Sequence, residues 1–241
     1  MEKAIIIEGL TKKYKNSRGI VDVSLMVERG DIFGFLGPNG AGKTTAMKIM
    51  TGLMRPDSGR VLINGFDVQT DCVRAMDGVG CIVESVTPFP YLTAIENLSL
   101  VARLHPGIGG DQIDSALEQV GILKYGGEKI KNFSLGMKQR LGIAMAIVSD
   151  PDILILDEPL NGLDVEGMVE MRKLFLNLAQ ERGKTLFISS HLIHDIELTC
   201  NKIGILYNGR QISVETTENI LKNYSSLENY YLSEVDSDAR A

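Results

Sequence analysis

One short segment constrains this chain more than any other: Gly37-Pro38-Asn39-Gly40-Ala41-Gly42-Lys43-Thr44. A short apolar strand is expected just before it, over residues 31–36, and a helix just after it, over 44–52. In this context the pattern indicates a loop that wraps around phosphate groups. Its glycines let backbone N–H groups point inward, and the helix N-terminus adds about half a positive charge. The sequence therefore predicts a nucleotide site.

The side chains of this Walker A loop have separate expected roles. Lys43 is expected to reach the β- and γ-phosphates, the Thr44 hydroxyl to bind Mg²⁺, and Thr45 to help hold the α-phosphate. A glycine-rich turn that caps a helix and leaves Lys43 in solvent is the plain alternative. The loop residues expected to bind nucleotide are Gly37, Pro38, Asn39, Gly40, Ala41, Gly42, Lys43, Thr44 and Thr45.

Composition narrows the class of protein. The chain has 241 residues, of which 44% are hydrophobic and 23% charged, as in a globular protein with one large core. Its apolar runs are far shorter than the ~20 residues that span a bilayer, and residues 1–4 do not begin a signal peptide. We therefore expect a cytosolic chain. Three scattered cysteines indicate reduced thiols, and a net charge of −6 without a basic run argues against a nucleic-acid partner.

The order of expected elements predicts an α/β core that a helical segment interrupts. Apolar residues at three-and-four spacing predict helices over 94–104, 112–120, 136–148 and 165–181. Apolar and β-branched runs predict strands over 4–9, 21–27, 31–36, 61–63, 79–83, 153–156, 185–189 and 203–206.

These elements suggest a division of the single domain, residues 1–241, into three parts. We assign residues 1–88 and 150–220 to the core, 89–149 to a helical part, and 221–241 to a C-terminal tail. The end of the chain is polar and acidic from about residue 225, so its last residues are expected to be mobile.

A second chemical feature is the apolar strand over 153–156, which ends in Asp157 and Glu158. A buried strand delivers Asp157 to the sheet edge, where it can orient a magnesium shell. Glu158 points elsewhere and can polarise the attacking water. Hydrolysis needs both functions, because water is a weak nucleophile and the γ-phosphate repels anions. A solvated Asp-Glu-Pro turn is the alternative, since apolar runs that end in acids are common.

Residues 132–140, Asn-Phe-Ser-Leu-Gly-Met-Lys-Gln-Arg, resemble the signature of ABC ATPases, usually LSGGQ followed by a basic stretch. Phe133 stands for the leucine, and Ser134 and Gly136 match. Leu135 replaces the first glycine and Met137 the glutamine. An ordinary helix capped by Ser134 is the alternative.

Three more positions follow the motif order of that family. Tyr14 stands where the family has the aromatic A-loop that stacks on adenine, Asp164 ends a segment that resembles the D-loop, and His191 follows a strand as the switch histidine does. A surface aromatic, a helix cap and a buried polar residue are the respective alternatives. Because the order holds over residues 4–215, the chain is identified as a member of the ABC ATP-binding subunits.

This resemblance implies a P-loop NTPase fold: a RecA-like α/β core with an antiparallel β subdomain and a helical insert. It implies two such subunits, arranged head to tail around two ATP molecules; a homodimer on ATP binding is expected, and a paralogue as the second subunit stays open as an alternative. The signature residues Ser134, Leu135, Gly136 and Met137 of one subunit then contact the γ-phosphate held by Lys43 of the other. The implied catalytic set is Glu158, His191 and Lys43.

The resemblance also implies a transmembrane permease as partner, with the chain peripheral on the inner face of the membrane. The helical part and the loop around residues 84–91 are the expected docking surface. Glu84 stands where the family has its Q-loop glutamine, so the implied metal ligands are Thr44, Asp157 and Glu84. A carboxylate ~4 Å from Mg²⁺ interacts with it by several kcal/mol, and we expect Glu84 to be ionised with the metal bound. A tolerated surface acid is the alternative.

Glu84, together with residues 134–144, resembles the bacitracin and lantibiotic self-protection transporters, which export antimicrobial peptides. An ABC ATPase of another exporter, or a soluble ABC ATPase of translation, DNA maintenance or cluster assembly, stays open as an alternative. The latter types usually have two cassettes or a long coiled coil, which this chain lacks. A regulatory module without turnover is disfavoured by the intact acids and His191. A small GTPase is disfavoured because no Asn-Lys-x-Asp motif is present.

Overall fold

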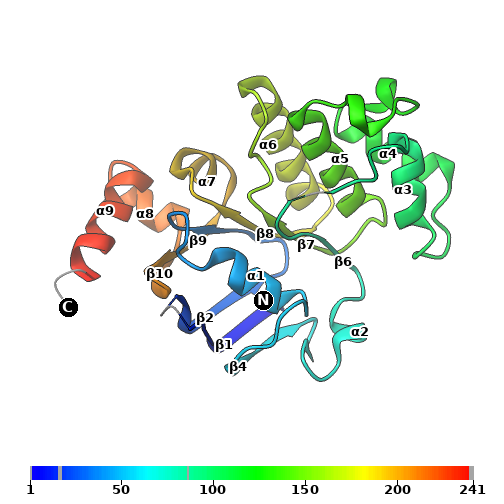
Figure 1. The fold of residues 1–241 in the computed structure, drawn as a ribbon. Coiled ribbons are helices and arrows are strands. Elements are labelled where there is room, and N and C mark those ends of the chain that lie inside the picture. Colours follow the sequence, from blue (N-terminus) through cyan, green and yellow to red (C-terminus); the bar gives the residue numbers. More distant parts are fainter. Residues whose placement is uncertain (1, 16–17, 86, 239–241) are drawn as a thin grey trace.

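The protein, described by a computed structural model over residues 2–15, 18–85 and 87–238, is organised around two β-sheets (Figure 1). The larger sheet has the strand order β10-β9-β3-β8-β7-β6. Its strands β3, β6, β7, β8 and β9 are parallel, and β10 pairs antiparallel at one edge. These strands are β3 (Ile32–Leu36), β6 (Val79–Ile82), β7 (Ile153–Asp157), β8 (Thr185–Ser190), β9 (Lys202–Tyr207) and β10 (Arg210–Thr216).

The central strands of this sheet are buried on both faces, which explains why they read as continuous apolar runs. Every residue of β3, β7 and β8 is buried. Successive side chains still face opposite ways: Phe33 and Phe35 enter one hydrophobic core, whereas Ile32 and Leu36 enter the other. The sheet therefore separates two cores and presents the carboxyl ends of its parallel strands at one edge.

The smaller sheet is antiparallel, with the strand order β2-β1-β4-β5. Helix α1 (Lys43–Met50) lies between the two sheets (Figure 1), and its buried Met47, Ile49 and Met50 share one core with both of them. This packing fixes the helix whose N-terminus follows the phosphate loop. The strands are β1 (Lys3–Lys13), β2 (Gly19–Glu28), β4 (Ser58–Ile63) and β5 (Phe66–Asp67).

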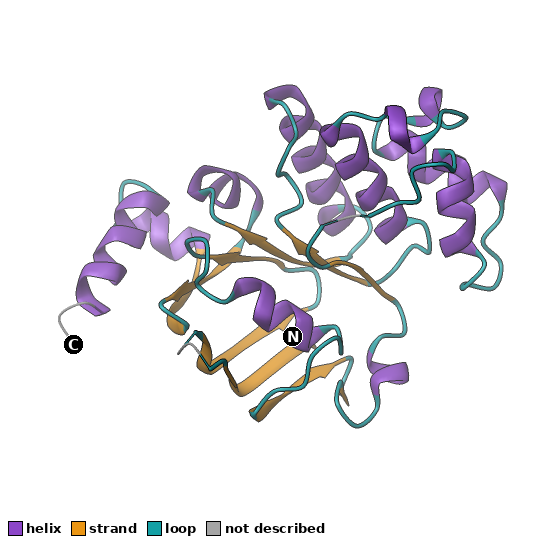
Figure 2. Ribbon diagram, in the orientation of Figure 1, coloured by secondary structure: helices purple, strands orange, loops and turns teal. Residues whose placement is uncertain are grey.

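Most of the helices gather on the other side of the larger sheet (Figure 2). They share the second hydrophobic core with the sheet, and none of the helices in the described part of the chain is long and apolar enough to cross a membrane. The helices there are α3 (Ala94–Ala102), α4 (Gly110–Gln119), α5 (Leu135–Ile147), α6 (Val165–Gln180) and α7 (Ile193–Thr199), with the 3-10 turns η1 (Leu123–Tyr125) and η2 (Ile130–Asn132). The expected α/β fold with an antiparallel sheet and a helical insertion is confirmed.

The end of the chain differs from the polar tail that the sequence analysis assigned to residues 221–241. Helix α8 (Thr217–Asn223) is followed by α9 (Leu227–Asp238), and Leu227 is fully buried. The Leu227 N–H donates to Glu197 Oε2 on α7 at 2.7 Å, and Tyr230 bonds the Ser213 hydroxyl on β10. The tail assignment was wrong for this helix, because a few apolar residues suffice to dock it. Residues 239–241, to which the expected mobility also applied, lie outside the described residues.

Candidate functional site

The phosphate loop connects β3 to α1, and at two of its positions the backbone conformation or the close packing leaves room for glycine alone. Gly42 has a φ of 109°, in the left-handed region, and a Cβ there would lie 2.4 Å from Ile20 Cγ2. A Cβ at Gly37 would lie 2.3 Å from the Leu206 carbonyl oxygen. Glycine is required at both positions, since both backbone segments pass too close to their neighbours for a side chain.

Lys43 is the first residue of α1, and its ammonium group lies inside this loop. The residue is only 6% exposed, and its Nζ donates to the Gly37 carbonyl at 2.6 Å and the Pro38 carbonyl at 3.3 Å. Glu158 Oε1 lies 3.2 Å from the same nitrogen. A buried cation needs such partners, and a phosphate oxygen is a stronger one than a carbonyl.

Asp157 ends β7 and accepts two hydroxyl hydrogen bonds. Thr44 Oγ1 donates to its Oδ2 at 2.8 Å, and Ser189 Oγ on β8 donates to its Oδ1 at 2.5 Å. Ser189 Oγ in turn accepts the Glu158 N–H at 3.0 Å. The hydroxyl groups of helix α1 and strand β8 thus hold the carboxylate at the end of β7 in one orientation. Ser189 was missed by the sequence analysis, although its place one strand away and two residues before His191 could have indicated it.

Glu158 has both carboxylate oxygens engaged. Oε1 faces Lys43, and Oε2 lies 2.9 Å from His191 Nδ1, in the loop after β8. Its φ of 47° is left-handed, a conformation that costs a non-glycine residue about 1–3 kcal/mol and is concentrated at functional sites. The structure therefore brings together four predicted site residues, Lys43, Asp157, Glu158 and His191, from the start of helix α1 and the ends of two strands, β7 and β8.

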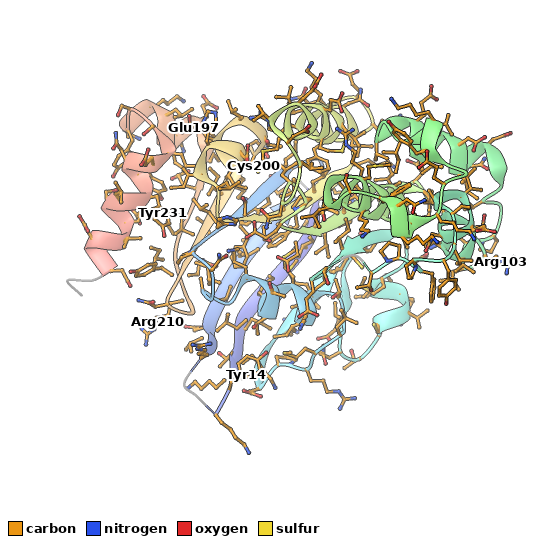
Figure 3. All side chains as sticks on the ribbon, turned by 45° about the horizontal axis from the view of Figure 1, so that its top comes forward. Tyr14, Arg103, Glu197, Cys200, Arg210 and Tyr231 are labelled. Carbon is orange, nitrogen blue, oxygen red and sulfur yellow. The ribbon has the colours of Figure 1, made fainter. Side chains whose placement is uncertain are left out.

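A cavity of about 660 Å³ opens beside the loop. Residues of the phosphate loop, Thr45 and Glu158 line it, as do Tyr14, Lys15 and Arg18. Tyr14 lies just past the end of β1 (Figure 3), is 40% exposed, and its hydroxyl donates to Met54 Sδ at 3.3 Å. An aromatic ring, basic side chains and a glycine-rich loop in one cavity suit a ligand with a flat ring and several negative charges.

Glu84 follows β6 and comes close to the same carboxylate through its backbone. Its φ is 66°, and its N–H lies 3.4 Å from Asp157 Oδ2. Its side chain turns the other way and forms an ion pair with Lys48 on α1. Lys48 was not singled out from the sequence, because no local pattern links residues 36 positions apart.

The signature residues lie elsewhere, at the start of α5. Ser134 Oγ accepts the Met137 N–H at 3.2 Å and caps the helix, and Leu135 is 69% exposed. Asp164 caps α6 in the same way, with its Oδ1 accepting the Gly167 N–H at 2.9 Å. A Cβ at Gly136 would lie 3.2 Å from the Gly162 carbonyl oxygen, so the two helix starts are adjacent. Among the described residues that line the cavity, none comes from these two segments.

Comparisons with known proteins agree with this geometry. The family model described as ABC transporter matches residues 20–161. The bacitracin transport ATP-binding protein BcrA of Enterococcus faecalis is 42% identical over 88% of this chain and 69% of its own length. The lantibiotic transport ATP-binding protein SrtF of Streptococcus pyogenes is 37% identical over 86% of this chain and 88% of its own length.

A solved structure extends the likeness to three dimensions. The dimeric structure of MJ0796, a bacterial ABC transporter cassette, superposes with a TM-score of 0.80 at 25% identity, over 88% of this chain and 98% of that one.

Proposed function

Because the chain belongs to the ABC transporter family and is an ATPase, we propose that its ATP hydrolysis drives export of antimicrobial peptides of the bacitracin or lantibiotic kind. The observation that carries the ATPase part of the proposal is the network of Lys43, Thr44, Asp157, Glu158 and His191, of which Lys43, Thr44 and Glu158 line the cavity. The names of BcrA and SrtF, and the glutamate at position 84, support the peptide class.

We assign the catalytic roles from the two oxygens of Glu158. When a γ-phosphate binds, Lys43 gains a stronger partner than Glu158, which leaves Oε1 free to accept a proton from the attacking water. His191 holds Oε2, keeps the carboxylate in place and lies near enough to contact the γ-phosphate. Tyr14 stacks on the adenine at the far end of the cavity.

The oxygens of Thr44 and Asp157 fit a magnesium ion. Mg²⁺ prefers hard oxygen ligands and is usually bound by one or two protein groups together with phosphates and water. Correspondingly, residues 2–15, 18–85 and 87–238 contain no group of three or more His, Cys, Asp or Glu that could hold a metal alone. When bound, the ion neutralises charge on the β- and γ-phosphates. Glu84 joins these ligands only if its carboxylate leaves Lys48.

The second half of each site comes, in our proposal, from another copy of the chain. Ser134 and Leu135 are not among the described residues that line the cavity, and they are exposed at the start of a helix, where anions bind readily. Head-to-tail pairing brings Ser134, Gly136 and Met137 of one subunit to the phosphate held by Lys43 of the other. Asp164 lies beside this contact. The dimeric MJ0796 cassette supports this arrangement.

The permease docks, we propose, on the apolar surface formed by residues 87–104. Phe89, Tyr91 and Leu104 are 49%, 64% and 78% exposed there, beside a groove of about 180 Å³. Exposed apolar clusters of this kind mark interaction sites. This contact would place the chain on the inner face of the membrane.

The loop at the centre of this surface is held in shape by hydrogen bonds. Asn97, 1% exposed, accepts the Phe89 N–H at 2.8 Å and donates to its carbonyl at 3.2 Å. The Ile130 and Lys131 N–H groups of η2 donate to the carbonyls of Leu92 at 3.0 Å and Pro90 at 2.8 Å. The signature begins at Phe133, two residues after Lys131, so these hydrogen bonds join the docking loop directly to the segment that leads into the signature.

The decisive experiment is to purify the intact membrane complex, identify its subunits and reconstitute it in vesicles. We expect a membrane permease to copurify, and bacitracin or a lantibiotic to stimulate phosphate release at least about twofold above the basal rate. The complex with the Glu158→Gln variant is the matched control and should release phosphate at least about 100-fold more slowly under either condition. The transport proposal would be contradicted if no membrane protein copurified with the chain. It would also be contradicted if an unrelated amphiphile stimulated phosphate release and neither peptide did.

A further inference from the structure

We propose that Lys48 is a positioning residue that holds the Glu84 carboxylate away from the Thr44 and Asp157 oxygens until metal and nucleotide bind. The proposal rests on the proposed Mg²⁺-ATP function of the cavity. It adds a residue to that site and assigns Glu84 two alternative partners.

The backbone and the side chain of Glu84 point to different groups. The backbone N–H lies 3.4 Å from Asp157 Oδ2, so the residue sits beside the oxygens that we assign to the metal. The carboxylate nevertheless pairs with the Lys48 ammonium. Its φ of 66° is uncommon for a residue with a side chain and requires support from neighbouring contacts. Asp157 and Lys48 supply such contacts.

Lys48 is not itself placed to bind the phosphates. It lies five residues after Lys43, which puts it about 7.5 Å further along the axis of α1 and about 140° around it. Its position in the last turn is favourable for a cation because the helix dipole is negative there. That preference explains why a lysine is tolerated at this position, and the Glu84 contact explains what it does.

The pair is weak enough to open during each cycle. The Glu84 side chain is 58% exposed and that of Lys48 is 26% exposed, so water screens their attraction. Exposed ion pairs shift an equilibrium by only about 1.4- to fivefold. A doubly charged metal ion attracts the carboxylate more strongly than one ammonium group does. The Glu84 carboxylate is therefore expected to remain paired with Lys48 in the absence of metal, and to move toward the metal ion once metal and nucleotide are bound.

The experiment measures metal affinity and not turnover. Mn²⁺ is titrated into the protein with a non-hydrolysable ATP analogue, and free Mn²⁺ is followed by electron paramagnetic resonance. Lys48→Met should bind Mn²⁺ about 1.4- to fivefold more tightly than the parent, because the competing partner of Glu84 is gone. Lys48→Arg keeps a cation and should stay closer to the parent.

Two further variants make the result specific. In a Glu84→Gln background, Lys48→Met should change Mn²⁺ affinity no further, since the pair is already absent. Lys222→Met removes a similar exposed pair with Glu218 on α8 and should leave Mn²⁺ affinity as in the parent. The proposal is overturned if Lys48→Met matches the parent, or if it shifts affinity equally with and without Glu84.

Failure of this proposal is distinguishable from failure of the proposed function. Binding of the ATP analogue without metal, and phosphate release by the parent protein, test the ATPase site and do not depend on Lys48. Circular dichroism and the thermal unfolding midpoint of each variant show whether it is folded.

Discussion

The phosphate-loop half and the signature half of the proposed ATP site differ in how far one chain completes them. In the first half, Lys43 and Asp157 are buried and bonded to groups from other elements. In the second half, the side chains of Ser134 and Asp164 cap their own helices, and Leu135 is exposed to solvent. Folding alone therefore builds one half, while the other half presents a surface to a partner.

Because of this difference, mutations in the two halves of the proposed site are expected to have different effects. Buried polar groups need their partners, so changes in the first half alter nucleotide binding and chemistry within one chain. Changes in the second half are expected to alter assembly, with only the small loss of stability that removal of a helix cap causes.

The largest effect is expected for Glu158→Gln. Hydrolysis should fall by at least about 100-fold, because the group that accepts the proton of water is lost. Nucleotide binding should persist, and the ATP-bound dimer should accumulate because it no longer hydrolyses its ligand. Phosphate release and light scattering after size exclusion measure the two quantities. Unchanged turnover without an ATP-dependent dimer would refute both the catalytic and the dimer assignments.

A smaller effect is expected for Lys43→Ala, within the same half. ATP affinity should fall about 10- to 150-fold, the range for losing a hydrogen bond to a charged group. Titration with a fluorescent ATP analogue measures it, with Lys222→Met as a control for loss of a positive charge. An affinity within twofold of the parent would show that the loop binds phosphate through its backbone alone.

Ser134→Ala tests the other half of the comparison. The free energy of unfolding should fall by about 1 kcal/mol through loss of the cap of α5. Binding of ATP to the monomer should stay unchanged, but dimer formation in the Glu158→Gln background should weaken. Thr216→Ala is the matched control, because Thr216 Oγ1 caps α8 by accepting the Asn219 N–H at 3.2 Å. If both variants dimerise equally well, Ser134 is a helix cap and nothing more.

The smallest effect is expected for the pH dependence of stability that Glu96 in helix α3 contributes. Glu96 has its pKa lowered from the ordinary value by hydrogen bonds from the Thr93 backbone and side chain. Its contribution to stability is present above the unfolded pKa of about 4.3 and is lost as pH falls through the lower folded pKa. Chemical unfolding of Glu96→Gln between pH 7 and 3 should show a shallower loss of stability than the parent. Parallel profiles would show that the capping box contributes no pH dependence.

The parts of the site that depend on local sequence context could be predicted from the sequence. The phosphate loop, Asp157, Glu158 and His191 each stand next to an apolar strand, so parallel strand order brings them to one edge. The expected helices and strands also match the corresponding observed elements to within a few residues at each end.

Contacts between distant segments were not predictable in this way. The Lys48–Glu84 pair and the Ser189–Asp157 bond join residues 36 and 32 positions apart, with no periodic pattern between them. Helix α9 was not predicted because its composition is polar, although its Leu227 and Tyr230 are buried against the core. For Ser134 and Asp164 the plain alternative of a helix cap is what the single chain contains, which does not conflict with a second role toward a partner.

The hydrogen bonds of the docking loop have a further consequence. Pro90 and Leu92 are joined to η2 by carbonyl groups of the main chain, which every residue possesses. The exposed apolar side chains, Phe89 and Tyr91 among them, would select the partner in the proposed docking, but they take no part in these bonds. In the proposed docking, recognition of the permease would therefore reside in side-chain atoms, and the connection to the signature segment in main-chain atoms. Side chains on this surface can diverge to suit a new permease while the connection to the signature segment stays intact.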